Sequence, residues 1–150
     1  MAEATRSLDI PAPPAAVWGA LADYGSISAW APDVDHSCLM SEQASGAGAV
    51  RRVQVGRIVL VERVTQWEDP ERLAYRIEGL PAAISSVTNT WHLEPSRDGT
   101  LVSVTTAVNV GPRPPQQLAS RAIAARLAKV SDGMLAGLRG HVRAREGSTS

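Results

Sequence analysis

The chain has 150 residues, a length that suits one domain over residues 1–150. Its 15 basic and 15 acidic side chains cancel formally, which does not favour nucleic acid or an anionic membrane as partner. Cys38 is the single cysteine, so no internal disulfide can form, and no apolar run approaches the roughly 18 residues that a transmembrane helix needs. The first ten residues lack the apolar core of a signal peptide, so we expect a cytoplasmic protein without membrane insertion.

One short strand and two short helices are predicted before the main sheet. Residues 5–10 alternate as a strand does. The proline-rich run at 11–14 ends that strand and starts a helix over residues 15–24, for which Gly25 is a suitable C-terminal cap. Residues 26–31 predict a second helical turn.

Six further strands are predicted between residues 34 and 108, where strand-like segments alternate with turn residues. The turn signals are Gly56-Arg57, Asp69-Pro70 and Asp98-Gly99, of which the last is the strongest hairpin signal. The strands cover residues 34–40, 49–55, 58–66, 73–78, 85–93 and 101–108. About seven antiparallel strands must bury one face of their sheet.

A long amphipathic helix over residues 113–145 is predicted to cover that face. Its apolar residues recur at steps of three and four, and they are Ile123, Leu127, Val130, Met134, Leu138 and Val142. The small residues at 146–150 predict a disordered tail.

The hairpin turns also predict which side chains point inward. With Gly56-Arg57 as the turn, Arg51 lies opposite Glu62 on the more apolar face. With Asp98-Gly99 as the next turn, Trp91 lies opposite Thr106 on that same face. The inward polar side chains are then His36, Arg51, Glu62, Tyr75, Asn89 and Thr106, with His36 near Arg51.

So many polar groups would be costly in a dry core, at about 1–3 kcal/mol for each unsatisfied neutral group. A partly wet cavity explains them, although each also has a purely structural explanation as a hydrogen-bonded or paired group. Trp18, Trp91 and the Cys38 thiol are predicted to be core. The candidate ligand-binding residues are Trp30, His36, Arg51, Val53, Leu60, Glu62, Tyr75, Asn89, Thr106, Val130 and Met134.

Three segments resemble a known superfamily: APPAAVWGALADY followed by W-x-P, then VERVTQWEDPERLAYRI, then TWHLEPSRDGT. Together with the order of elements they are similar to the SRPBCC superfamily, which includes START-related lipid-transfer domains, the birch-pollen allergen class and the polyketide cyclase/dehydrase group. The resemblance implies an α+β helix-grip fold, in which a curved antiparallel sheet wraps a long C-terminal helix. It also implies a cavity for apolar or aromatic molecules, in which some members catalyse cyclisation or dehydration.

Two functions follow as hypotheses. The first is binding of a hydrophobic or aromatic small molecule that is lipid-, isoprenoid- or polyketide-like, by a monomer or weak homodimer. The second is a polyketide cyclase/dehydrase-type enzyme, in which Glu62 or His36 acts as base while Arg51 and Tyr75 stabilise an enolate oxygen. Neither hypothesis needs a cofactor. No metal site is expected either: the candidate ligands are His36, Cys38, Glu62 and His92, of which His92 falls on the other face of the sheet, and no CxxC or HxxxH spacing occurs.

Overall fold

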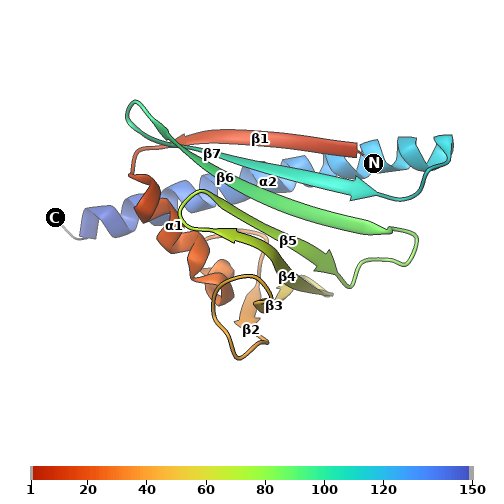
Figure 1. The fold of residues 1–150 in the computed structure, drawn as a ribbon, viewed down its shortest axis with the longest axis horizontal. Helices are drawn as coiled ribbons and strands as arrows, with labels where there is room; N and C mark the ends of the chain where they lie inside the picture. Colours follow the sequence, from red (N-terminus) through yellow and green to blue (C-terminus); the bar gives the residue numbers. More distant parts are fainter. Residues whose placement is uncertain (1, 149–150) are drawn as a thin grey trace.

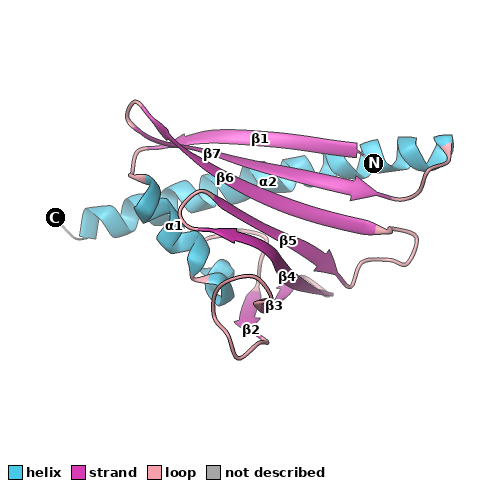
Figure 2. Cartoon of the chain, viewed as in Figure 1, coloured by secondary structure: helices cyan, strands magenta, loops and turns pink. Residues whose placement is uncertain are grey.

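The computed structural model describes residues 2–148 and contains one sheet, two α-helices and a short 3₁₀ helix (Figures 1 and 2). The elements in chain order are β1 (Ala2–Ile10), α1 (Pro14–Ala22), the 3₁₀ helix η1 (Tyr24–Ala29), β2 (His36–Leu39), β3 (Val50–Val55), β4 (Ile58–Glu68), β5 (Arg72–Glu78), β6 (Ser86–Ser96), β7 (Gly99–Asn109) and α2 (Pro114–Ser148).

The sheet is antiparallel, in the order β1-β7-β6-β5-β4-β3-β2. The first strand therefore pairs with the last, and the remaining strands follow as a meander. Figure 1 shows β1, β7 and β6 running along α2, while β5 to β2 turn away from it. The predicted helix-grip fold, with a curved seven-stranded sheet around a long C-terminal helix, is confirmed.

The terminal helix runs for 35 residues, or about 52 Å, and continues beyond residue 145, where the predicted helix ends. Residues 146–148 of the predicted tail continue this helix, and residues 149–150 lie outside the described part of the chain. No helix within residues 2–148 is long and apolar enough to cross a membrane. Leu138 and Val142 of the predicted stripe are buried, whereas Val130 is 38% exposed.

Two glycines serve close packing rather than the turn roles predicted for them. A Cβ atom on Gly25 would lie 2.7 Å from Leu39 Cγ, and Gly25 is inside η1 rather than capping α1. A Cβ atom on Gly99 would overlap the carbonyl oxygen of Ile10. Gly99 therefore begins β7 opposite Ser96, and the hairpin turn is Arg97-Asp98.

The β6–β7 register is consequently two residues from the predicted one, with Trp91 opposite Val104 and Asn89 opposite Thr106. Because side chains alternate with a period of two, this shift leaves the side chains of β6 and β7 on their predicted faces. All six predicted pairs between β3 and β4 are confirmed, including Arg51 with Glu62.

The buried apolar residues form two clusters. The larger contains Trp18 and Trp91, as predicted, and reaches Val53, Tyr75 and Met134. The smaller is built on Val87, Val108 and Ala124, with Ile77 and Leu127 packed against it. Ile77 is also packed against the larger cluster, so β5 links the two.

Candidate functional site: a cavity beneath the terminal helix

A cavity of about 290 Å³ lies between the inner face of the sheet and α2. Its lining is mostly apolar and comes from the η1 region, five strands and the terminal helix. The lining residues are Ile27, Ala31, Asp33, Val34, Val53, Val55, Leu60, Glu62, Tyr75, Ile77, Asn89, Thr106, Leu127, Val130, Ser131 and Met134. Val130 of α2, which is 38% exposed, is one of these lining residues.

Most of the candidate ligand-binding residues line this cavity. The eight that do are Val53, Leu60, Glu62, Tyr75, Asn89, Thr106, Val130 and Met134. Trp30, His36 and Arg51 do not line it. That any of the eight binds a ligand remains a prediction.

His36 and Cys38 lie on the outer face of β2 and are exposed, so the predicted proximity of His36 to Arg51 and the buried Cys38 thiol are both wrong. His36 pairs with Gln54, and it is Leu39 that lies opposite Arg51. Residues 40–49, between β2 and β3, form a loop rather than a hairpin turn. The sequence therefore had no turn between β2 and β3 from which the inward-facing side chains of β2 could be predicted.

Trp30, a candidate ligand-binding residue, is a core residue and does not line the cavity. Its ring packs edge-on against Trp91, with 5.7 Å between the ring centroids. A Cβ atom on Gly137 would overlap the Trp30 carbonyl oxygen, so this segment crosses α2 in close contact. Trp30 is therefore held where its segment crosses α2.

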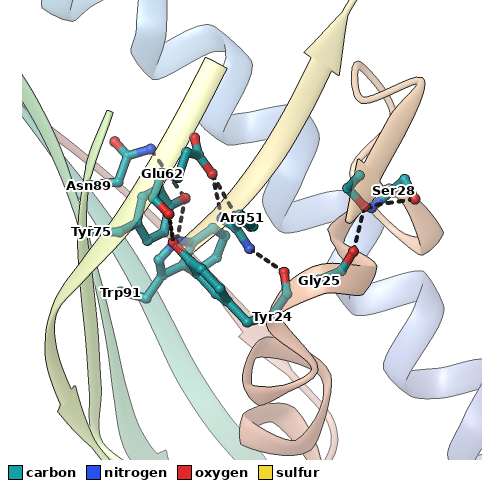
Figure 3. Close-up of polar contacts among 9 residues, drawn as sticks. Tyr24, Gly25, Ser28, Arg51, Glu62, Tyr75, Asn89 and Trp91 are labelled. Carbon is teal, nitrogen blue, oxygen red and sulfur yellow. Dashed lines mark hydrogen bonds and ion pairs between the residues drawn. The ribbon is translucent and has the colours of Figure 1, made fainter. Parts of the chain in front are cut away.

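Arg51 forms a buried ion pair with Glu62, and Glu62 lines the cavity (Figure 3). Arg51 Nη2 lies 2.7 Å from Glu62 Oε1, and Arg51 Nε donates to the same oxygen at 2.8 Å. Arg51 Nη1 donates to the carbonyl oxygen of Tyr24 at 3.0 Å. The guanidinium carbon lies 3.9 Å from the ring centroid of Tyr24 and 4.6 Å from that of Tyr75, so aromatic rings cover the cation.

Tyr75 joins a second set of hydrogen bonds beside the pair. Its hydroxyl oxygen accepts from Asn89 Nδ2 at 3.3 Å and from Trp91 Nε1 at 3.2 Å. Thr106 donates to Asn89 Oδ1 at 2.7 Å. These bonds fix the position of the Tyr75 hydroxyl at the cavity wall and leave its own proton for another acceptor.

The local environment keeps the phenols neutral and the guanidinium charged. Burial raises the pKa of Tyr24, which the nearby Arg51 only partly opposes. Burial also raises the pKa of Tyr75, and the Glu62 carboxylate adds to this. Burial alone would lower the pKa of Arg51, but Glu62 and the two phenols outweigh it, so the net direction is upward. Tyr75 therefore keeps its O–H donor at neutral pH.

Among the residues that line the cavity, Glu62 thus has an acceptor oxygen to spare and Tyr75 has a donor to spare. Glu62 Oε1 takes both contacts from Arg51, and no described residue hydrogen-bonds to Oε2. Figure 3 shows Glu62 with one oxygen turned to Arg51 and the other turned away. Within residues 2–148, no group of three His, Cys, Asp or Glu side chains is placed to hold a metal ion.

The candidate set omitted Tyr24 and eight of the lining residues, which are Ile27, Ala31, Asp33, Val34, Val55, Ile77, Leu127 and Ser131. Tyr24 was predicted only as the end of a helix, yet its ring covers Arg51 and its hydroxyl donates to the Glu62 carbonyl oxygen at 3.0 Å. Asp33 lies in the loop after η1 and lines the cavity. Tyr24 was placed on a helix, but no pattern in the sequence showed that it reaches Arg51, and Asp33 follows no strand or helix period.

Comparison with known protein families gives a match over almost the whole chain. A family model described as polyketide cyclase / dehydrase and lipid transport matches residues 1–143. None of the curated proteins gives a match.

Solved structures share the fold at low sequence identity. A protein from Thermobifida fusca is 27% identical, with a TM-score of 0.74 over 95% of this chain and 93% of its own. The Zhui aromatase/cyclase from Streptomyces sp. R1128 is 18% identical, with a TM-score of 0.75 over 96% of this chain and 94% of its own. A START superfamily protein from Mycobacterium smegmatis is 13% identical, with a TM-score of 0.73 over 94% of this chain and 97% of its own.

Proposed function

Because this chain belongs to the polyketide cyclase / dehydrase and lipid transport family, we propose that it binds a hydrophobic or aromatic small molecule between the sheet and α2. The ligand classes that fit the lining are lipid-, isoprenoid- and polyketide-like molecules. The observation that carries this proposal is the cavity itself, in which apolar side chains of α2 and the sheet border space that the chain leaves unfilled.

The chemistry of the lining supports binding. Apolar side chains such as Val53, Leu60 and Leu127 form most of the wall. Each 100 Å² of apolar ligand surface removed from water there contributes about 2.5 kcal/mol. A few polar side chains of the lining, such as Glu62 and Tyr75, orient the ligand, as polar groups usually do in small-molecule sites.

A second candidate function is a polyketide cyclase/dehydrase-type enzyme, favoured by the unpartnered Oε2 of Glu62 beside the Tyr75 hydroxyl. In this alternative Glu62 removes a proton from the carbon next to a ligand carbonyl. The C–H electron pair forms the carbon–carbon double bond of the enolate, the π pair of the carbonyl moves to its oxygen, and the Tyr75 O–H hydrogen-bonds that oxygen. His36 has no part in it, because its side chain is exposed on the outer face. Arg51 does not line the cavity and acts only through Glu62.

One experiment tests both functions with 2-tetralone, a bicyclic ketone, in deuterated buffer. We expect saturable binding by NMR, with exchange of the α-protons no faster than in buffer. Exchange that the protein accelerates, and that Glu62→Gln removes, would instead support the enzyme. Absence of saturable binding of 2-tetralone would contradict both functions.

A further inference from the structure

We infer that the cavity selects neutral ligands that carry a hydroxyl or amide N–H donor, and that it discriminates against carboxylates. This inference rests on the proposed function, since it concerns which molecules the cavity holds. The observations that carry it are the burial of the nearby cation, the charges on the cavity wall and the unequal use of the two Glu62 oxygens.

The cation nearest the cavity is not available to a ligand. Three Arg51 nitrogens are engaged, by Glu62 Oε1 and by the Tyr24 carbonyl oxygen. The rings of Tyr24 and Tyr75 lie against the guanidinium, and Arg51 is only 2% exposed. A ligand carboxylate entering the cavity therefore finds no bidentate arginine partner of the kind that binds carboxylates elsewhere.

The charged side chains that do line the cavity are both acidic. They are Asp33 and Glu62, and the described lining residues include no Lys, Arg or His. Arg51 balances the negative charge of Glu62, but both of its contacts are with the Oε1 oxygen. An anionic ligand would lose its hydration and gain only like-charged or neutral neighbours, which is a large cost inside a protein.

A donor on the ligand meets a matching acceptor instead. No described residue hydrogen-bonds to Glu62 Oε2, while the Glu62 side chain is only 7% exposed. An unpaired carboxylate oxygen in such a site favours an O–H or N–H donor, because hydrogen bonds to ionised acceptors are about twice as strong as neutral ones. The Tyr75 hydroxyl, which already accepts two hydrogen bonds, has its proton left for a carbonyl or hydroxyl oxygen of the same ligand.

A ligand series on one skeleton tests this selectivity at pH 7, by calorimetry or ligand-observed NMR. The probes are naphthalene, 2-naphthol, 2-methoxynaphthalene and 2-naphthoate, which is ionised at this pH. We expect 2-naphthol to bind at least about tenfold more tightly than naphthalene or 2-methoxynaphthalene, and 2-naphthoate to bind most weakly. Equal affinity of 2-naphthol and 2-methoxynaphthalene, or tight binding of 2-naphthoate, would overturn the inference.

Matched variants assign the effect to one carboxylate. Glu62→Gln is expected to reduce the preference for 2-naphthol over 2-methoxynaphthalene to about twofold or less, and to improve 2-naphthoate. Glu78→Gln alters a carboxylate on the outer face, paired with Arg63 at 3.5 Å, and is expected to keep the wild-type preference. A preference that survives Glu62→Gln in a variant with native circular dichroism would overturn the assignment.

The outcomes separate this inference from the proposed function. If naphthalene binds and the donor preference is absent, the cavity is a ligand site without the selectivity inferred here. If no member of the series binds, the proposed function and the inference both fail. The wild-type series tests the selectivity without any variant, so this test remains valid even if Glu62→Gln does not fold.

Discussion

Leu60→Trp is expected to weaken binding of 2-naphthol by at least about tenfold, because the new indole would occupy the space that a bicyclic ligand needs. Leu60 lies on the inner face of β4, opposite Val53, and its side chain lines the cavity. The indole can enter an existing space, so stability should fall by less than the 1–3 kcal/mol typical of overpacking a filled core. Calorimetric titration and urea unfolding of the same variant measure the two effects.

Val59→Trp is the matched control for this substitution. Val59 is the neighbouring residue on β4, but it points to the outer face and is 42% exposed. The same side chain introduced there should leave the affinity for 2-naphthol within about twofold of the wild-type value. Equal losses at both positions, or none at Leu60, would show that the ligand does not occupy this cavity.

Arg51→Met is expected to destabilise the protein by about 3–5 kcal/mol, the typical cost of removing one partner of a buried ion pair. Methionine preserves much of the side-chain volume but leaves the Glu62 carboxylate without its counterion and the Tyr24 carbonyl oxygen without its donor. The free energy of unfolding, measured in urea, reports the loss.

The double variant Arg51→Met/Glu62→Leu separates the cost of an orphaned charge from the value of the pair. Replacing both charges by apolar groups should recover most of the stability, since buried pairs contribute little over a well-packed apolar pair. If Arg51→Met alone lowers the free energy of unfolding by less than about 1 kcal/mol, the pair is as weak as a solvated surface pair, which would contradict its burial.

The strand register that the sequence predicted fully is the one set by local turn chemistry. Gly56 has a φ of 60°, so the two-residue Gly-Arg turn fixed all six pairs of the β3–β4 hairpin. The Asp98-Gly99 signal misplaced the turn by one residue and the register by two, because Gly99 is needed where the chain at Ile10 passes over it. The inner and outer faces were still correct, since a shift of two preserves alternation.

The candidate site was predictable only where it follows a strand period. Glu62, Tyr75 and Asn89 were placed correctly by alternation along their strands. His36 was not, because the loop between β2 and β3 carries no register information. Arg51 faces inward as predicted, but the sequence could not show that a residue 27 positions away, Tyr24, covers it. Contacts of that kind depend on how η1 packs against the sheet, which no short-range pattern encodes.

The structure of the protein with 2-naphthol bound, determined by crystallography or from NMR contacts between ligand and methyl groups, tests the ligand site most directly. We expect the ring system between the sheet and α2, in contact with Leu60, Leu127 and Val130, and its hydroxyl within hydrogen-bonding distance of Glu62. Naphthol bound on the outer face of the sheet, or an interior filled by side chains with no space for the ligand, would contradict this expectation.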